Sequence, residues 1–305
     1  MPTVMSRFVI PRFLRLARRN RNYIDADLAR AHVRERGLRP VAYGPPRTLR
    51  GLDVTVVRDR GWPVYTLTPT AGAVRGALVY AHGGGWVGEI AAQHWRLAAQ
   101  LAVRVRLAVT VPIYPLIPFG TAAEVIPRVA ELVRAAGAEY GPTFLAGDSA
   151  GGQIALSTAL HLRDLGQPAP LRTVLISPAL DLTLENPQID EVQPRDPWLG
   201  RDGGLVFGGL WSGALSMRDP MVSPLFGDLT GLGPLTVFTG TEDILNPDAR
   251  LLAAKARAAG VHLDYREGAG LVHVYPLTPS AEGSAARRRI VSILRADLDG
   301  AQVVS

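Results

Sequence analysis

The sequence contains no cysteine among its 305 residues. This absence excludes a disulfide framework and any metal cluster held by thiolates, so we expect no bound metal. A chain without cysteine fits a reducing compartment, and we predict a cytoplasmic location. No apolar run reaches the ~18 residues that a membrane-spanning helix needs, so no such helix is predicted.

Acidic residues are fewer than basic ones. Asp and Glu number 27 against 33 Lys and Arg, which gives a net charge of +6, and much of the excess lies within residues 1–50. A basic balance is compatible with nucleic acid or anionic lipid as a partner. We favour the plainer interpretation of a solvated, arginine-rich surface, and we expect no nucleic-acid partner.

The N-terminal segment up to Tyr23 is basic and amphipathic. Apolar residues from Phe8 to Leu16 are mixed with arginines, and Pro11 and Arg12 interrupt them. No small-residue cleavage site follows, so the segment does not fit a signal peptide. We interpret it as an amphipathic helix that docks on the protein. Association with a membrane surface is the alternative, and no obligate membrane association is predicted.

From Leu52 onward the apolar pattern predicts a hairpin and then alternating strands and helices. Alternation with period two over 53–58 and 64–68 predicts the hairpin. Further strands are predicted at 77–81, 107–113, 143–146, 173–176, 235–239 and 261–266, and helices at about 91–104, 121–137, 150–166, 247–259 and 280–298. Residues 181–215, rich in Pro, Gly, Asp and Trp, break the pattern and are predicted to be irregular. The fold class is α/β, a mostly parallel central sheet with helices on both faces.

A Gly-x-Ser-x-Gly sequence, Gly147-Asp148-Ser149-Ala150-Gly151, joins the strand at 143–146 to a helical run. This pattern is typical of a nucleophile elbow, a strained turn that exposes a serine at the carboxyl end of a strand. The two glycines are needed because side chains there would block so tight a turn. The sequence therefore predicts Ser149 as a nucleophile.

A serine hydroxyl needs a histidine as base and an acid that orients the histidine, here in the chain order nucleophile, acid, base. His273 follows the last predicted strand, whereas His262 lies inside it, so we predict His273 as the base. Asp243 and Glu242 both follow the strand at 235–239, and we favour Asp243 as the acid.

The other acids and histidines have structural interpretations. Asp248 suits the first turn of a helix, where a negative charge is favourable. Asp148 is expected to hold the elbow, and His82 to support the glycine loop that follows it. The remaining histidines lie in predicted helices and are interpreted as surface or packing residues, namely His32, His94 and His161.

Three consecutive glycines after His82, followed by Trp86, form a loop behind an early central strand. Bare backbone N–H groups there can bind the oxyanion that forms during acyl transfer. We predict Gly84, Gly85 and Ala150, the first residue of the new helix, as oxyanion donors.

Taken together, the motifs resemble the hormone-sensitive-lipase-like esterases of the α/β-hydrolase fold. The motifs are His82–Trp86, Gly147–Gly152, Asp219–Leu225, Gly240–Leu245 and His273. The resemblance implies a helical cap formed by segments 1–50 and 181–215, over a core formed by 51–180 and 216–305. One departure stands at Tyr114–Phe119, where the Arg and Glu common in the family are absent; this stretch resembles a branch of actinobacterial acetyl-ester and lactone hydrolases.

The sequence thus predicts a cofactor-free serine carboxylesterase acting on acyl esters of about two to eight carbons, with acetyl esters or lactones as candidates. The alternatives are an amidase or peptidase on the same triad, or a non-catalytic protein of this fold that binds a small molecule. Four aromatic residues are candidates for the substrate pocket, namely Trp86, Trp198, Phe207 and Trp211. The sequence leaves open whether the chain forms a homodimer.

Overall fold

The computed structural model describes residues 2–39 and 41–304. Met1 and Pro40, which belong to the predicted segment 1–50, lie outside the described residues, as does Ser305. The strands are β1 (Leu52–Asp59), β2 (Trp62–Pro69), β3 (Ala77–Ala81), β4 (Ala108–Pro112), β5 (Thr143–Asp148), β6 (Thr173–Ile176), β7 (Leu235–Glu242) and β8 (Leu263–Val272). The helices are α1 (Ile10–Leu16), α2 (Ala26–Leu38), α3 (Ala92–Leu101), α4 (Ala122–Tyr140), α5 (Ala150–Asp164), α6 (Ile189–Val192), α7 (Arg201–Ser212), α8 (Asn246–Ala258) and α9 (Ala281–Val304). Shorter helical turns are η1 (Met5–Val9), η2 (Ala102–Arg106), η3 (Pro224–Phe226) and η4 (Tyr275–Leu277).

The strands form one sheet in the order β1-β2-β4-β3-β5-β6-β7-β8. The predicted hairpin is confirmed, since β1 and β2 pair antiparallel, and β2 pairs antiparallel with β4. All later neighbours pair in parallel. Every residue of β3, β4 and β6 is buried, as their continuous apolar runs predict for strands covered on both faces.

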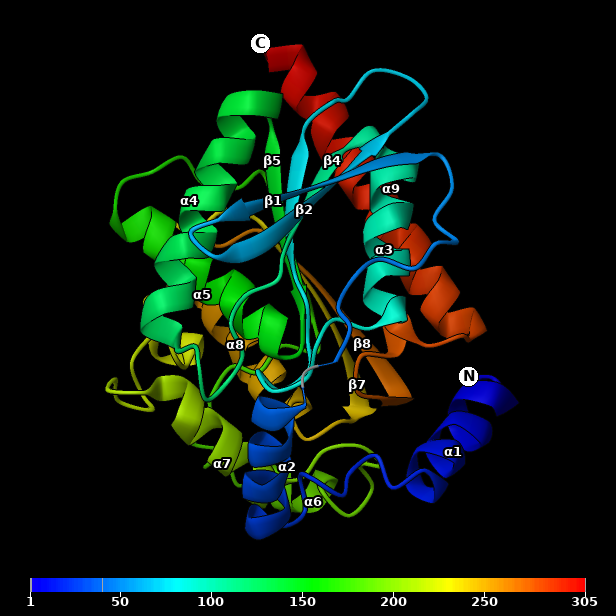
Figure 1. The fold of residues 1–305 in the computed structure, drawn as a ribbon, viewed down its shortest axis with the longest axis vertical. Helices are drawn as coiled ribbons and strands as arrows, with labels where there is room; N and C mark the ends of the chain where they lie inside the picture. Colours follow the sequence, from blue (N-terminus) through cyan, green and yellow to red (C-terminus); the bar gives the residue numbers. More distant parts are fainter. Residues whose placement is uncertain (1, 40, 305) are drawn as a thin grey trace.

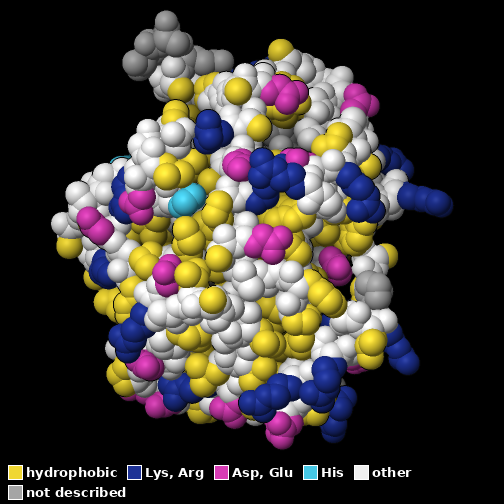
Figure 2. Space-filling view, turned by 60° about the vertical axis from the view of Figure 1, so that its left-hand side comes forward, with side chains coloured by type: hydrophobic (Ala, Val, Ile, Leu, Met, Phe, Trp, Pro, Cys, Tyr) yellow, Lys and Arg dark blue, Asp and Glu magenta, His cyan; other side chains and the backbone are white. Residues whose placement is uncertain are grey.

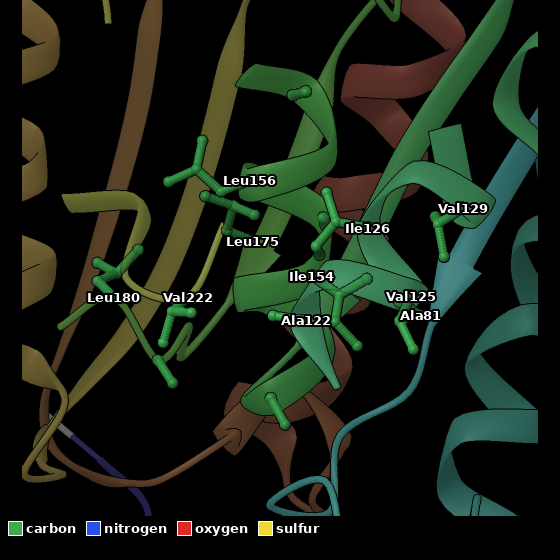
Figure 3. Packing of buried hydrophobic residues seen from close by; sticks show 14 of the residues in the cluster. Ala81, Ala122, Val125, Ile126, Val129, Ile154, Leu156, Leu175, Leu180 and Val222 are labelled. Carbon is green, nitrogen blue, oxygen red and sulfur yellow. The ribbon is translucent and has the colours of Figure 1, made fainter. Parts of the chain in front are cut away.

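Helices cover both faces of the sheet (Figure 1). One face carries α4, α5 and α8, and the other carries α3 and α9. On α4 the apolar residues Ala122, Val125, Ile126 and Val129 recur every three or four positions and are fully buried. They pack with Ile154 of α5 in the core (Figure 3). Burying one such Val or Ile side chain stabilises the fold by roughly 1.5–3 kcal/mol.

Helices α2, α6 and α7 lie together beyond the carboxyl ends of the parallel strands (Figure 1). The expectation that 181–215 is irregular was wrong for α7, a helix of 12 residues. Its glycines lower helix propensity, but Gly203 allows a close approach of two segments. The Gly203 N–H donates to the Tyr23 carbonyl at 2.7 Å, and a Cβ at Gly203 would lie 2.2 Å from the Asn22 carbonyl oxygen. Contact with the N-terminal segment therefore outweighs local propensity.

The last strand also differs from its prediction. It extends through Gly268 and Gly270 to Val272, because it pairs with β7 across those glycines up to Glu242. His273 therefore follows the strand directly, without an intervening loop.

The N-terminal segment docks on the protein as predicted, through buried Ser6, Pro11 and Leu14. Its larger apolar side chains nevertheless face outward, for Phe13 is 60% exposed and Leu16 is 84% exposed. Within residues 2–39 and 41–304 none of the helices has the length and apolar character that crossing a bilayer requires. Figure 2 is turned so that the side of the molecule with α4 comes forward. On the face that it shows, basic and acidic side chains are interspersed.

Candidate active site

Ser149 stands at the turn between β5 and α5, and its φ of 53° lies in the left-handed region that side chains disfavour. A Cβ at Gly147 would lie 2.0 Å from the Gly151 carbonyl oxygen. A Cβ at Gly151 would in turn lie 2.0 Å from the Ala81 carbonyl oxygen on the neighbouring strand. The two glycines are required by backbone packing, and the strained turn exposes the Ser149 hydroxyl.

The structure brings Ser149, His273 and Asp243 together, although they are far apart in the chain. His273 Nε2 lies 2.9 Å from Ser149 Oγ, and His273 Nδ1 lies 2.8 Å from Asp243 Oδ2. Asp243 is fully buried, and its other oxygen accepts the Leu245 N–H at 3.0 Å. This arrangement leaves Nε2 as the nitrogen that can accept a proton from the serine.

The turn that carries His273 is also held in place by a hydrogen bond to Ser177. The Val274 N–H donates to Ser177 Oγ at 3.0 Å, and both Val274 and Ser177 adopt a positive φ. Burial lowers the pKa of His273, but the charge and hydrogen bond of Asp243 outweigh burial, so the pKa is raised above its ordinary value. A basic imidazole beside a hydroxyl is what proton abstraction requires.

A second buried carboxylate, Asp196, was missed by the sequence reasoning. It accepts the N–H groups of Trp198 and Leu199 and, at 2.9 Å, that of Ile244, the residue after the catalytic-acid candidate. Burial, and then the charge of Asp243, raise the pKa of Asp196 to about 7. Asp196 therefore ties segment 181–215 to the loop of Asp243. No pattern in the sequence marks it.

The rejected candidates lie elsewhere. Glu242 ends β7 and faces Arg195 at 3.4 Å, and His262 is exposed and lies just before β8. Asp248 is buried in the first turn of α8, where Asn186 donates to it at 2.8 Å and burial raises its pKa to about 7. Among the described residues, His273 forms its side-chain hydrogen bonds with Asp243 and Ser149 and with none of these three.

The glycine loop lies against the elbow. The N–H groups of Gly84, Gly85 and Ala150 have no hydrogen-bond acceptor within the described residues, so they are free to bind a substrate oxygen. Asp148 accepts the Gly83 N–H at 3.0 Å and thereby holds the loop to the elbow. Preorganised donors of this kind stabilise an oxyanion because they need no reorientation during the reaction.

Three buried residues, Tyr80, His94 and His82, support Asp148 and the glycine loop. Tyr80 donates a hydrogen bond to Asp148, and His94 Nε2 lies 3.3 Å from it. His82 stacks on Tyr114 at 4.5 Å, and burial, followed by the proximity of His94, lowers its pKa to about 4. His82 is thus a neutral packing residue beneath the glycine loop, as the sequence suggests.

The family model described as the alpha/beta hydrolase fold matches residues 78–277, which include all of these groups and the sheet from β3 onward, apart from Ala77. The chain belongs to the α/β-hydrolase family. The hydrolase is 32% identical to LipR of Mycobacterium tuberculosis over 239 residues, which is 77% of each chain. It is 33% identical to an acetyl-hydrolase of Streptomyces hygroscopicus over 201 residues, 65% of this chain and 67% of that one. A solved hormone-sensitive lipase from a metagenome library superposes with a TM-score of 0.81 at 26% identity, covering 95% of this chain and 97% of that one. The predicted resemblance to hormone-sensitive-lipase-like esterases is confirmed.

A pocket opens beside the nucleophile of this hydrolase, and we call it the serine pocket. The space open to the centre of a water-sized sphere is about 40 Å³. Its lining consists of Tyr23, Gly85, Trp86, Ser149, Ala150, Ala179, Asp181, Leu182, Leu184, Leu199, Gly200, Gly204, Ile244 and Leu245. The wall is mostly aliphatic, which suits an acyl chain.

Of the four aromatics predicted for the substrate pocket, Trp86 lines the serine pocket, whereas Trp198, Phe207 and Trp211 do not. Trp211 is fully buried, stacks on Trp86 at 5.8 Å and donates to Gln153 at 2.9 Å, which makes it a supporting residue. Trp86 also donates to Gln153, at 3.2 Å. Sequence reasoning missed Gln153 because a glutamine on a helix carries no distinctive signal.

Trp198 and Phe207 line a separate hollow, which we call the arginine pocket. It measures about 390 Å³ by the same definition. Its lining consists of Ala17, Arg18, Arg19, Asn22, Tyr23, His32, Arg36, Gly84, Val87, Gly88, Trp198 and Phe207. Gly84 and Tyr23 place this pocket next to the serine pocket.

Proposed function

We propose that the chain is a serine carboxylesterase in which Ser149 is the nucleophile, His273 the base and Asp243 the orienting acid. The reaction class, ester hydrolysis by a serine hydrolase, agrees with the names of the relatives, and the sequence prediction of this class is confirmed. The roles of the individual residues are the proposal. The observation that carries it is the pair of hydrogen bonds from Ser149 through His273 to Asp243.

In the first half of the reaction, Ser149 Oγ forms a bond to the ester carbonyl carbon while His273 Nε2 takes the hydroxyl proton. The negative charge moves to the carbonyl oxygen, where Gly84, Gly85 and Ala150 donate hydrogen bonds. The bond from the carbonyl carbon to the alcohol oxygen then breaks, and His273 returns the proton to the leaving oxygen.

In the second half, water attacks the acyl-enzyme and gives a proton to His273. The bond to Ser149 Oγ breaks, and the proton moves from His273 to Ser149 as the carboxylic acid leaves. Asp243 keeps the imidazole in one tautomer throughout. Because every group is supplied by the chain, the mechanism needs neither metal nor cofactor.

The serine pocket supports a short acyl group as the substrate. The serine pocket is small, at about 40 Å³, and therefore favours a short acyl chain. We place the acyl preference at two to four carbons, the short end of the range expected from the sequence. Acetyl esters fit this size, and one relative is named an acetyl-hydrolase.

The helical cap predicted from the sequence, segments 1–50 and 181–215, is also part of the proposed function. Tyr23 precedes α2, and Leu182, Leu184, Leu199 and Gly204 come from segment 181–215, so both predicted cap segments line the serine pocket. Tyr23 also packs edge-on against Phe207 of α7 at 5.2 Å, which joins the two segments. We propose that together they exclude water from the acyl-enzyme.

The test is a hydrolysis series with p-nitrophenyl esters from acetate to octanoate. We expect kcat/KM to fall about fourfold for each methylene that the pocket cannot house, since each forfeits ~0.8 kcal/mol of burial. Leu199→Ala enlarges the pocket and should move the optimum by about two carbons. Leu205→Ala, on the exposed side of α7, is the matched control and should leave the profile unchanged.

Labelling with an organophosphate identifies the nucleophile independently of chain length. We expect the label on Ser149 in the wild type and no label in Ser149→Ala. A label on another serine, or preference for long acyl chains in the wild type, would contradict the proposal. The alternative of an amidase or peptidase is not favoured, because relatives are named as ester hydrolases, among them two esterases, an acetyl-hydrolase and a triacylglycerol lipase.

The cytoplasmic location and the expectation of no nucleic-acid partner stay predictions from composition. The same holds for the absence of obligate membrane association and for a homodimer, whose existence the sequence leaves open.

A further inference from the structure

The arginine pocket carries a positive charge that the catalytic mechanism does not use. Its lining includes Arg18, Arg19 and Arg36 and no acidic residue. Among the described residues, none of the three guanidinium groups forms an ion pair or a side-chain hydrogen bond. Elsewhere in the chain arginines with carboxylate partners are common, as in the pair Arg172–Asp297 at 2.6 Å.

Acidic residues near the pocket form no ion pair with these arginines in the part of the chain that the structure describes. Burial lowers the pKa of His32, and the charge of Arg36 lowers it further, whereas the charge of Glu35 raises it. Burial raises the pKa of Glu89, and the charge of Arg36 opposes this effect. Neither Glu35 nor Glu89 comes within ion-pair distance of an arginine in the described residues. The side chains that line the pocket therefore carry a net positive charge.

The position of the pocket identifies the part of the substrate that it receives. Gly84, an oxyanion donor in our proposal, lines it, and so does Trp198, whose ring packs edge-on against the ring of His273 at 5.7 Å. His273 must reach the leaving oxygen to protonate it. The serine pocket adjoins the arginine pocket through Tyr23, has Ser149 and Ala150 in its wall and is mostly aliphatic. The acyl group therefore occupies the serine pocket and the alcohol part occupies the arginine pocket.

We propose that the natural substrate is an ester whose alcohol part bears a negative charge, a carboxylate or a phosphate. This inference rests on the proposed esterase function and adds the chemical class of the leaving group. Guanidinium groups bind both anions well, since their N–H donors match the spacing of the oxygens. The alcohol released by cleavage of the acyl C–O bond is then an anionic hydroxy compound protonated by His273.

The probes are two acetates that differ in the charge of the leaving group. Hydrolysis of 4-acetoxybenzoate releases an anionic phenol, and hydrolysis of methyl 4-acetoxybenzoate releases a neutral one. The measured quantity is the ratio of the two kcat/KM values, compared between variants so that the intrinsic reactivities of the esters cancel. A third acetate, 4-acetoxyphenyl phosphate, distinguishes phosphate from carboxylate as the preferred anion.

The test variant is Arg18→Gln/Arg19→Gln/Arg36→Gln, which keeps the size of the side chains and removes the charges. An exposed charge pair contributes a factor of about 1.5 to 5, so we expect the ratio to fall about tenfold in the triple variant. High salt should lower the wild-type ratio as well, because it screens exposed charges. Arg12→Gln/Arg21→Gln removes two exposed arginines of the same segment that do not line the pocket, and it should leave the ratio unchanged.

The outcomes separate the two proposals. A ratio that the triple variant does not change, or that the control variant lowers equally, would overturn the anionic leaving group while Ser149→Ala still abolishes hydrolysis of both acetates. Hydrolysis that survives in Ser149→Ala would instead overturn the esterase mechanism itself. Thermal unfolding of each variant verifies that the fold is intact.

Discussion

The substitution Asp243→Asn tests the orientation of the base because it changes one atom of the side chain. Asp243 Oδ1 accepts the Leu245 N–H at 3.0 Å, and Oδ2 faces His273 Nδ1 at 2.8 Å. In the variant, the amide oxygen keeps the bond to Leu245, which turns the NH₂ group toward His273. An NH₂ group donates, so Nδ1 must accept, and the imidazole proton moves to Nε2.

The consequence is an imidazole that presents a proton to the hydroxyl instead of a lone pair. Ser149 Oγ lies 2.9 Å from Nε2 and can no longer transfer its proton there. In a Ser-His-Asp triad the wrong histidine tautomer lowers kcat by about 10⁴-fold, and we expect a loss of the same order here. That factor corresponds to about 5.5 kcal/mol of transition-state stabilisation.

The assay is kcat on p-nitrophenyl acetate, with Glu242→Gln as the matched control. Glu242 faces Arg195 at 3.4 Å near the surface, and such a pair contributes ~0–1 kcal/mol, so its variant should keep kcat within about fivefold. The reasoning is refuted if Asp243→Asn stays within tenfold of the wild type, or if Glu242→Gln is the inactive variant.

Three further predictions concern the base, the pH profile and the elbow. His273→Ala should lower kcat by on the order of 10⁴- to 10⁶-fold in the same assay, whereas exposed His262→Ala should have little effect; the opposite ranking would move the base. Neutral His273 is the active form and its pKa is raised above 6.5, so kcat/KM should fall as the pH drops through a value above 6.5; a limb below 6.5 would contradict this. Gly151→Ala forces a Cβ to 2.0 Å from the Ala81 oxygen and should reduce the free energy of unfolding, measured in urea, by about 3 kcal/mol or more. Gly209→Ala, which meets nothing within 4 Å inside α7, should instead increase it by ~0.5–1 kcal/mol, and equal effects of the two would refute the packing argument.

Local sequence signals determined the motif-bearing parts of the site. The elbow is a tight turn within a few residues, so its glycines and Ser149 are recognisable in one short stretch. His273 and Asp243 could be chosen because each follows a strand, and parallel strands end at one edge of the sheet. The alternation of apolar runs predicted the sheet and the helices on its faces for the same reason, since burial on both faces demands it.

The tertiary structure alone decided how the substrate pockets are lined. Tyr23 and Trp198 are both large aromatic residues in predicted cap segments. Tyr23 lines the serine pocket, whereas Trp198 does not line it and lies in the wall of the arginine pocket. Trp211 became a buried support because Gln153 binds its indole N–H, a contact between residues 58 positions apart. Which side of a helix meets which neighbour depends on the packing of distant segments, and a single sequence carries no local signal for it.

Asp196 and α7 are two further features that the tertiary structure decided. The glycines of α7 favour irregular structure locally, but Gly203 lets the helix pack against the N-terminal segment. Asp196 is an unremarkable acid until the fold buries it beside Asp243 and three backbone N–H groups converge on it. The sequence by itself determined the chemistry of this hydrolase through short-range motifs. The shape and charge around that chemistry were decided by contacts between residues far apart in the chain, because only folding brings those residues within a few ångströms of each other.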